Sequence, residues 1–490
     1  MATIFAVEVQ WNGEAWQGET SYARHISIRS GFERSGDAVA GVGRCTVVLD
    51  NRSRRFSPGN TASPLYPFLK PRRRLRVRTW DGETSWTLFS GWIERIEPES
   101  GPYGERRVRF EVVDGIGRLA GQRIGVAHED SKPVDEAVQD IVHSVYFPLF
   151  TDFGDNGDVL HHYGAPWLPE KTTALDALRD VCAAVWGRFY LARDGTAIFR
   201  TRTQRQTPST AVALTLDDGA LDDLHIGLDV NSVINRAQVT VYPVETVGAP
   251  QEVWRARTVL RLAPGQQRVV YANFHDDNTE RCAAVDVSAP EPYTDYTVNE
   301  YSDGSGFDYT DKPAFDLSAE IEATRAAITL TNTAIGPLYV TLLRVRGRPI
   351  RTYDPITLEG SDITSQYAYE VRGRAYNLPM QPDPVFGEAL ANYFVVRHKE
   401  PQLAAERLQL ADRVQLAGVD VFSLELLDRI AIADSQSGLS AVHLVRAVAY
   451  EIDGRGFRVT FELERADDTA YWLLESDDFG HLGETTHLAL

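Results

Sequence analysis

Cysteine is scarce in this chain of 490 residues, which contains only Cys45, Cys182 and Cys282. The three are odd in number, widely separated and without a CxxC pair. Their spacing therefore excludes a disulfide framework, a zinc finger and an iron–sulfur cluster. Thiols used in this way act as small apolar side chains, which is typical of a protein made in a reducing cytosol.

Long apolar runs and a basic excess are also missing. The longest runs, such as residues 393–396, are far too short to span a bilayer, so we expect no membrane insertion. The amino terminus has no basic stretch followed by an apolar core, and we expect no signal peptide. The chain has 50 Lys and Arg against 69 Asp and Glu, a formal net charge of −19. This balance argues against a global affinity for nucleic acid or anionic membranes.

Common catalytic signatures are missing as well, because the sequence has no GxSxG, HExxH or P-loop motif. The best metal candidate is the pair His161 and His162. Two carboxylates, Asp155 and Asp158, lie a few residues before that pair. Adjacent side chains of a strand point to opposite faces, so a solvated polar loop is the favoured interpretation. Residues 303–311 offer oxygen ligands for calcium, but not in the EF-hand order. We expect no catalytic, cofactor-binding or metal site.

The sequence does contain a strong alternation of apolar and polar residues, as in residues 24–29 and 107–112. Apolar side chains at every second position, bounded by Gly, Pro, Asn and Asp, indicate half-buried strands. Residues 1–120 show no long helical pattern and are predicted to form a β-barrel or sandwich. A polar turn ahead of an alternating strand recurs in residues 88–113 and 428–463. This weak repeat suggests that the first and last thirds are two copies of one barrel type.

Helical periodicity is confined to a few segments. The apolar residues of 134–142 fall on one helical face, and a second helix is predicted to start at Thr172 or Thr173. A hairpin over residues 188–200 follows that helix. A third helix is predicted over residues 383–399, with proline in its first turn.

The predicted fold is mainly β with a small α+β part. It comprises two tube-like β-barrel domains, an α+β domain and a small β-sandwich module. The predicted boundaries are 1–120 for the first barrel, 121–205 for the α+β domain, 206–245 together with 365–490 for the second, discontinuous barrel, and 246–364 for the inserted module.

Charge is segregated along the chain. Residues 51–80 carry nine Lys or Arg and no acid, whereas residues 291–320 carry eight acids and one Lys. Such segregation favours a partner surface or complementary contacts between subunits, and a solvated face is an equal alternative. The candidates for an interface are seven residues of the basic segment: Arg52, Arg54, Arg55, Lys70, Arg72, Arg73 and Arg74.

Several segments, in order, resemble those of a known family. The first is residues 47–60, with the sequence VVLDNRSRRFSPGN. The others, in chain order, are residues 63–67, 69–71, 75–79, 88–93, 174–200, 295–306, 342–348, 354–357, 365–373 and 383–399. Together these segments cover nearly the whole chain. The pattern is similar to that of siphophage minor tail proteins, the trimeric hub proteins of the tail tip or baseplate.

The resemblance implies a structural, non-enzymatic protein of the virion tail tip, made in the host cytoplasm. It implies a homotrimer in which each subunit supplies two tube-like barrels, so that six barrels form a ring. The ring would join the tail tube to the tip and fibre apparatus and line the DNA exit channel. The implied partners are distal tail-tube ring proteins, the tape measure protein and tail fibre or receptor-binding proteins, with DNA only in transit. No cofactor is implied, and the basic segment is expected to contact another subunit or a neighbouring ring.

Two alternatives stay open. A carbohydrate-active multi-domain β enzyme, acting on a glycan or on the cell wall, would use some of the 9 Trp and two of the many carboxylates in a cleft. A hub of a contractile injection system shares the implied fold and differs in its neighbours.

Overall fold

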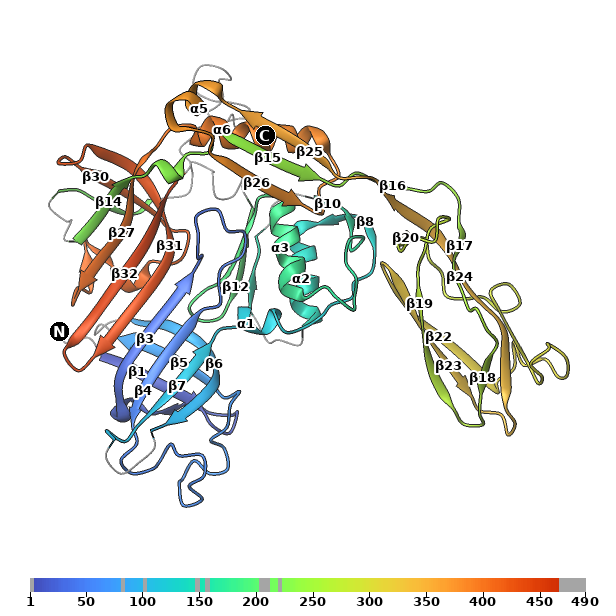
Figure 1. Ribbon diagram of the computed structural model, residues 1–490. Helices are drawn as coiled ribbons and strands as arrows, with labels where there is room; N and C mark the ends of the chain where they lie inside the picture. Colours follow the sequence, from blue (N-terminus) through green and yellow to red (C-terminus); the bar gives the residue numbers. More distant parts are fainter. Residues whose placement is uncertain are drawn as a thin grey trace.

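The computed structural model describes residues 4–80, 84–99, 104–145, 150–154, 159–201, 212–218 and 223–466. Strands hold 48% of the residues and helices 13%, which confirms the predicted mainly β class with a small α+β part. None of the sheets that the described strands form is closed. Figure 1 shows two strand-rich units on one side, helices in the middle and a slender β module on the other side.

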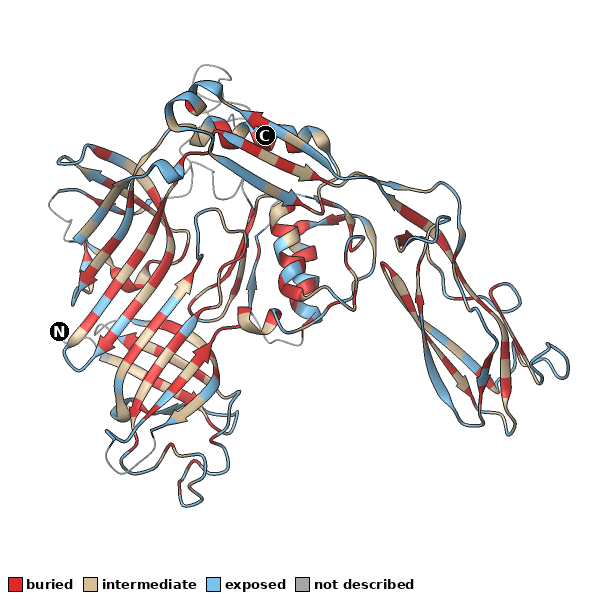
Figure 2. Cartoon of the chain, viewed as in Figure 1, coloured by how far each residue is buried: buried red, intermediate tan, exposed pale blue. Residues whose placement is uncertain are grey.

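The first strand-rich unit is formed by residues 4–113. Its six main strands are β1 (Ile4–Gln10), β3 (Ala23–Gly31), β4 (Arg44–Asp50), β5 (Arg74–Trp80), β6 (Ser85–Pro98) and β7 (Arg107–Val113). They pair in the spatial order β3-β4-β7-β6-β5-β1, all antiparallel, and the short β2 (Gln17–Gly18) adds to β1. Burial alternates along the strands because neighbouring side chains point to opposite faces, as Figure 2 shows.

The second strand-rich unit comes from two separate stretches of chain. Its six strands are β13 (Val212–Leu216), β14 (Asp223–Leu228), β27 (Leu403–Ala411), β30 (Arg429–Asp434), β31 (Leu439–Asp453) and β32 (Gly456–Arg465). Their spatial order is β14-β27-β32-β31-β30-β13.

The two units share one topology. Each strand of the first unit has a counterpart at the same place in the second unit. The pairs are β3 with β14, β4 with β27, β7 with β32, β6 with β31, β5 with β30 and β1 with β13. The chain order of the strands is kept in the same correspondence. A difference lies at the first strand, since β1 is antiparallel to β5 whereas β13 is parallel to β30. The weak repeat in the sequence therefore corresponds to a duplicated six-stranded unit.

Irregularities in the ladders fix how the units correspond residue by residue. The β6–β7 ladder shifts register at Glu94, and the β31–β32 ladder shifts at Arg446. When these two bulges are superposed, Phe110 of β7 corresponds to Phe461 of β32. Both phenylalanines are fully buried, so they are equivalent core positions of the two units.

The two units join edge to edge. The strand β3 pairs with the second half of β31, from His25 opposite Asp453 to Gly31 opposite Ala447. The first half of β31 pairs with β30. One thirteen-stranded sheet therefore runs through both units, and one hydrophobic core continues across them. The strands approach closely at this joint: a Cβ atom on Gly31 (φ +129°) would lie 2.4 Å from the carbonyl oxygen of Arg446.

A small α+β part packs beside the joined units. Its elements are α1 (Ile116–Leu119), β8 (Glu129–Pro133), α2 (Val134–Ser144), β9 (Thr151–Asp152), β10 (Val159–Tyr163), α3 (Ala174–Ala184), β11 (Arg188–Leu191) and β12 (Ala197–Arg200). The side chain of Thr173 caps α3 by accepting a hydrogen bond from the Asp176 amide at 3.2 Å. The predicted helices over 134–142 and after Thr172 or Thr173 are confirmed, as is the hairpin over 188–200.

A three-stranded sheet with two helices links the second unit to the module. It contains β15 (Arg236–Val241), β25 (Ile356–Ser361) and β26 (Gly373–Leu378), together with α5 (Ile363–Tyr369) and α6 (Pro384–His398). Asp383 caps α6, and Pro384 occupies its first turn, as the sequence predicted. Leu390 and Phe394 of α6 belong to a separate small core with β15.

The module on the far side has its own core. Its strands are β16 (Val244–Thr246), β17 (Gln251–Arg255), β18 (Leu260–Leu262), β19 (Gln267–Asn273), β20 (Ala283–Val285), β21 (Tyr296–Asn299), β22 (Phe315–Glu322), β23 (Arg325–Asn332) and β24 (Leu338–Thr352). The long β24 pairs with β16, β17, β18, β20 and β21, and β19, β23 and β22 form a second sheet. The four domain boundaries given above stay a prediction.

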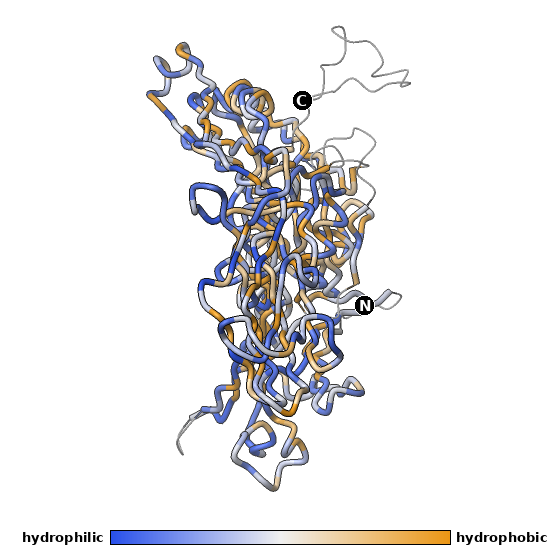
Figure 3. Tube along the Cα trace, turned by 90° about the vertical axis from the view of Figure 1, so that its right-hand side faces the viewer, coloured by the Kyte–Doolittle hydropathy of each residue, from blue (hydrophilic) through white to orange (hydrophobic). Residues whose placement is uncertain are grey.

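The short elements that remain are η1 (Thr20–Tyr22), η2 (Val230–Ser232), η3 (Val421–Ser423), β28 (Gln415–Leu416) and β29 (Val419–Asp420). Turned by 90°, the chain is much narrower than in the first view, with hydrophobic and hydrophilic residues mixed along its length (Figure 3). Within the ranges described, every helix is too short or too polar to cross a membrane.

Candidate functional site

The basic segment lies at one end of the first unit, in the connection between β4 and β5 and in β5 itself. Four of the seven predicted interface residues are exposed: Arg52, Arg54, Lys70 and Arg72. Arg52 pairs with Asp50 of β4, and hydrogen bonds from Arg52 hold the pKa of that carboxyl well below its usual range. The exposed cations Arg54, Lys70 and Arg72 therefore form the part of the segment best placed to meet a partner.

The other three predicted residues contact the fold itself. Arg55 donates to both oxygens of Glu19, at 3.0 and 2.7 Å, and so neutralises a fully buried carboxylate. Arg73 donates to the Phe68 carbonyl oxygen at 3.0 Å. Arg74 packs against two tryptophan rings.

The guanidinium of Arg74 lies 5.7 Å from the ring centroids of both Trp16 and Trp92. Burial, followed by the nearby charge of Arg76, lowers the pKa of Arg74. A count of charges along the sequence does not distinguish such a packed arginine from an exposed one. The feature that identifies Arg74 as packed is its contact with two tryptophans, which come from other parts of the chain.

The acidic run 291–320 lies on the module, well away from the basic segment in Figure 1. The structure therefore does not pair these two regions within one chain. Asp295 is the buried member of the run, with 1% of its surface exposed. It accepts hydrogen bonds from Arg344 at 3.3 Å and from Arg346 at 2.6 and 2.9 Å, so it stabilises the module.

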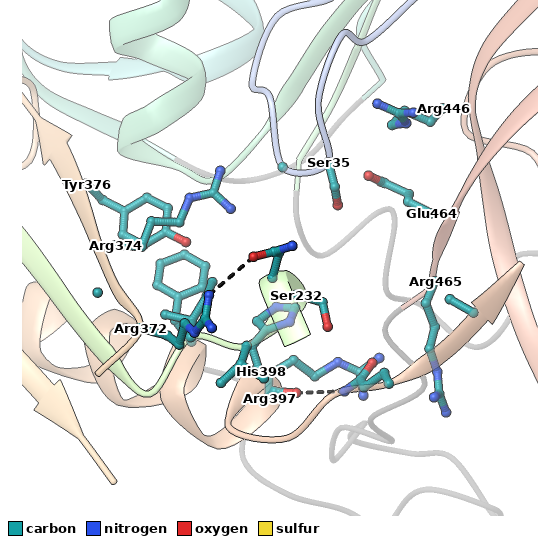
Figure 4. A pocket seen from close by; sticks show the side chains of 18 of the residues that line it. Ser35, Ser232, Arg372, Arg374, Tyr376, Arg397, His398, Arg446, Glu464 and Arg465 are labelled. Atoms are coloured by element: carbon teal, nitrogen blue, oxygen red, sulfur yellow. Dashed lines mark hydrogen bonds between the residues drawn. The ribbon is translucent and has the colours of Figure 1, made fainter. Parts of the chain in front are cut away.

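A cavity of about 810 Å³ opens between the second unit, β26, α6 and the loop at Ser35 (Figure 4). Its walls are rich in arginine. The five arginines that line it are Arg372, Arg374, Arg397, Arg446 and Arg465. They come from four separate segments of chain, which explains why no sequence motif predicted them.

Several of these arginines already hold backbone or side-chain oxygens. Arg372 donates to the Asn231 side chain at 3.2 Å, and Arg397 donates to the Ala466 carbonyl oxygen at 2.6 Å. The buried carboxylate of Glu464, also in the wall, pairs with Arg188 of β11. The carboxylates of Glu406 and Glu464 also line the cavity, and these hydrogen bonds assign Arg372 and Arg397 to the fold itself.

The structure places His162, one residue of the predicted metal candidate, beside His128 and Asp130. Asp155 and Asp158 lie outside the described residues. His162, at the end of β10, faces Asp130 of β8, and its Nδ1 atom is 3.8 Å from the Asp130 Oδ1 atom. His128 joins the same cluster, with its Nε2 atom 3.0 Å from the Asp130 Oδ1 atom. The signal that could have found it is the spacing of His128 and Asp130, since residues two apart in an extended segment lie on one face.

Carboxyl groups with a raised pKa are bound into the fold. Burial raises the pKa of Asp114 to about 7, and this side chain accepts hydrogen bonds from the amides of Gly43 and Ile116. Burial also raises the pKa of Asp180 to about 6, and its carboxylate accepts a hydrogen bond from the Trp167 indole at 3.0 Å. The hydrogen bonds of these two groups thus assign them to structure, although a raised pKa is also what a catalytic acid needs.

No protein-family model and no curated protein matches the sequence. Among solved structures, the chain is similar to the tail protein from Neisseria meningitidis MC58, with a TM-score of 0.49 and 11% identity over 95% of this chain and 97% of that one. It is similar to the 43 kDa tail protein of prophage MuSo2 from Shewanella oneidensis, with a TM-score of 0.48 and 9% identity over 94% and 98% of the two chains. A third similar structure is the prophage tail protein gp18 from Listeria monocytogenes EGD-e, with a TM-score of 0.43 and 8% identity over 94% of each chain.

Proposed function

We propose that this chain is a structural hub protein of a phage-type tail. Three copies form a ring that joins the tail tube to the tip and fibre apparatus and lines the channel through which DNA leaves. The observation that carries the proposal is the duplicated six-stranded unit, whose two copies are joined edge to edge through β3 and β31. A closed ring repeats one kind of contact around its axis, and this chain makes that contact once within itself.

Each chain also has two strand edges that match those of the internal joint but pair with no further described strand. In the duplicated topology β6 corresponds to β31, and β14 corresponds to β3. Whereas β3 has ladders on both sides, β14 pairs with β27 alone among the described strands. Residues 95–98 of β6 likewise pair only with β7 among the described strands, although the matching part of β31 also pairs with β3. These two matching edges are the surfaces through which neighbouring copies join.

The internal joint predicts the register of the joint between copies. Superposing the two bulges places Ile96 of β6 at the position of Val448, which faces Ser30 across the internal joint. His225 opposite Arg407 corresponds to Ser27 opposite Thr46, and counting three residues along each strand places Leu228 at the position of Ser30. Ile96 of one copy therefore faces Leu228 of the next. Leu228 is 63% exposed in the single chain, an apolar side chain that this pairing would cover.

Three copies supply six units, with internal joints and joints between copies alternating around the ring. The number three comes from the resemblance of the sequence to trimeric hub proteins. The net charge of −19 suits a channel that DNA must leave without binding, with acidic groups toward the axis. The tail-tube ring and the fibre apparatus would contact the two faces of the ring, and the tape measure protein would pass through it.

Disulfide trapping tests the proposed joint. Ile96→Cys and Leu228→Cys are combined in a Cys282→Ser background, because Cys45 and Cys182 are buried whereas Cys282 is partly accessible. We expect mild oxidation to give covalent dimers and trimers on non-reducing gels, and native mass spectrometry to give a trimer. The matched control combines Ile96→Cys with Ile335→Cys. Ile335 is fully exposed, but it lies on the module and away from the proposed joint. A trimer without crosslinks would overturn the register, and a monomer at every concentration would overturn the ring.

A further inference from the structure

The cluster of His128, Asp130 and His162 lies outside the surfaces of the proposed ring joint. The strands β8 and β10 pair so that His161 faces Ser131 and Tyr163 faces Glu129. His162 lies between these pairs with a φ angle of +53°, and its Nδ1 atom is 3.8 Å from the Oδ1 atom of Asp130 in β8. One ligand atom from each of the three residues lies within 4.8 Å of the other two.

The carbonyl oxygen of Tyr163 determines which nitrogen of His128 carries the hydrogen when the ring is neutral. Its Nδ1 atom is 3.0 Å from the carbonyl oxygen of Tyr163. A carbonyl oxygen only accepts, so Nδ1 carries the hydrogen. In the neutral ring the Nε2 atom then points its lone pair at the Asp130 carboxylate, 3.0 Å away. Two electron pairs at that distance repel unless a cation lies between them.

His162 places a second ring nitrogen close to the same carboxylate. Its Nδ1 atom is buried and forms no hydrogen bond with any described residue, while it lies 3.8 Å from the Asp130 Oδ1 atom. The two imidazole rings are stacked, with centroids 5.9 Å apart and planes 14° apart. A proton between His128 and Asp130 would leave His162 without a partner. A single ion between the three atoms would satisfy all of them.

We propose that His128, Asp130 and His162 bind one divalent transition-metal ion of the zinc class. Imidazole nitrogen and carboxylate oxygen are ligands that zinc favours, with bonds of about 2.0–2.2 Å, and atoms on one ion then lie about 3–3.5 Å apart. The carbonyl oxygen of Tyr163 holds His128 in the tautomer that exposes Nε2, as second-layer acceptors do around zinc sites. Three protein ligands leave a fourth position, which water fills.

The ion would strengthen the attachment of the module. The segments beside the cluster contact the module directly: the Ala323 amide donates to the Val126 carbonyl oxygen at 2.9 Å, and the Thr324 hydroxyl donates to the Trp167 carbonyl oxygen at 3.2 Å. Because β8 and β10 form a sheet of only two strands, few backbone hydrogen bonds hold them together. Binding to the folded chain alone would stabilise this region by mass action.

Metal titration of the full chain tests the proposal. After treatment with a chelator, the protein is titrated with Zn²⁺ by calorimetry and with Co²⁺ by visible absorption. We expect one ion per chain, a tetrahedral Co²⁺ spectrum and a higher melting temperature with Zn²⁺. His162→Ala and Asp130→Asn should weaken the affinity by roughly 100-fold or more. Asp130 is exposed, so Asp130→Asn keeps the fold even if the histidine variant does not.

His161→Ala is the matched control, because His161 is the adjacent, exposed histidine of the same strand. It should keep the affinity, the spectrum and the thermal shift of the unaltered chain. Affinity that falls equally in His161→Ala and His162→Ala, or wild-type binding no tighter than that of His162→Ala, would overturn the site. Neither result depends on ring assembly, so this test and that of the proposed function fail separately.

Discussion

The two strand-rich units reach one topology from very different arrangements of chain. The first is formed by a continuous stretch, residues 4–113. The second is interrupted between β14 and β27 by the linking sheet, its helices and the whole module. Four of the five ladders, the bulges at Glu94 and Arg446 and the buried Phe110 and Phe461 nevertheless correspond. Strand pairing and core packing therefore define the unit, and the connections between strands can vary without changing it.

The largest expected effect comes from removing equivalent aromatic side chains of the two units. Phe110→Ala and Phe461→Ala should each lower the free energy of unfolding by about 3–5 kcal/mol, because each leaves a cavity in a fully buried site. One core continues through both units, so either change should reduce hydrogen-exchange protection in both. Loss of protection confined to the altered unit would contradict a shared core.

The second prediction separates the units by pH. His443 of β31 is fully buried, and its Nε2 atom accepts a hydrogen bond from the Ala405 amide at 2.9 Å. Burial lowers the pKa of His443 from 6.5 to about 4. Its position in the first unit corresponds to Gly91, which cannot titrate.

The unfolded chain binds a proton at His443 below pH 6.5, and the folded chain binds it only near pH 4. The free energy of unfolding should therefore fall by about 3 kcal/mol as the pH drops from 6.5 to 4. His443→Gln retains an acceptor for the Ala405 amide and should remove this component. The free energy of unfolding of the unaltered chain and of His443→Gln is measured by urea unfolding at several pH values. Parallel pH profiles would count against a contribution from His443.

The third prediction concerns the joint between the units. Gly31→Ala should lower the free energy of unfolding by about 1–3 kcal/mol, because the new Cβ would meet backbone atoms of Arg446 and Ala447 within 2.5 Å. Gly18→Ala, on the edge strand β2, places its Cβ in open space and should change it by less than about 0.5 kcal/mol. Equal effects in denaturant unfolding would mean that the joint is not closely packed.

The smallest effect on stability is expected in the basic segment of the first unit. Lys70→Glu with Arg72→Glu, both exposed, should leave the monomer folded, with a change within about 0.5 kcal/mol, but should abolish ring assembly. Arg74 is spared because it packs against Trp16 and Trp92. Arg268→Glu, an exposed change on the module, is the control. Native mass spectrometry measures assembly, and trimers in the double variant would remove this segment from the interface.

The sequence predicted those features that local patterns determine. The cap at Thr173, the helix that begins after Asp383 and the alternating strands all follow from residues close together in the chain. The repeat at 88–113 and 428–463 pointed to the duplicated unit, but the joint between β3 and β31 did not follow from it. Pairing between strands so far apart depends on which edges meet in three dimensions, and no local pattern specifies that.

The candidate sites show the same division. Charge counting found the basic segment, but it did not separate Arg54 and Arg72, which are exposed, from Arg55, which holds a buried carboxylate. Similarly, the sequence grouped His162 with His161, Asp155 and Asp158, and it did not connect His162 with His128 or Asp130. His128 and Asp130 reach it because β8 pairs with β10, and the arginine-lined cavity likewise depends on the packing of separate segments.

Electron microscopy of the assembled protein tests the central claim most directly. If three copies form a ring with alternating internal and intermolecular joints, class averages viewed along the axis should show six lobes of similar size around an open centre, with threefold symmetry. Particles without a ring, or a ring whose lobes cannot be assigned to two equivalent units per chain, would contradict the account.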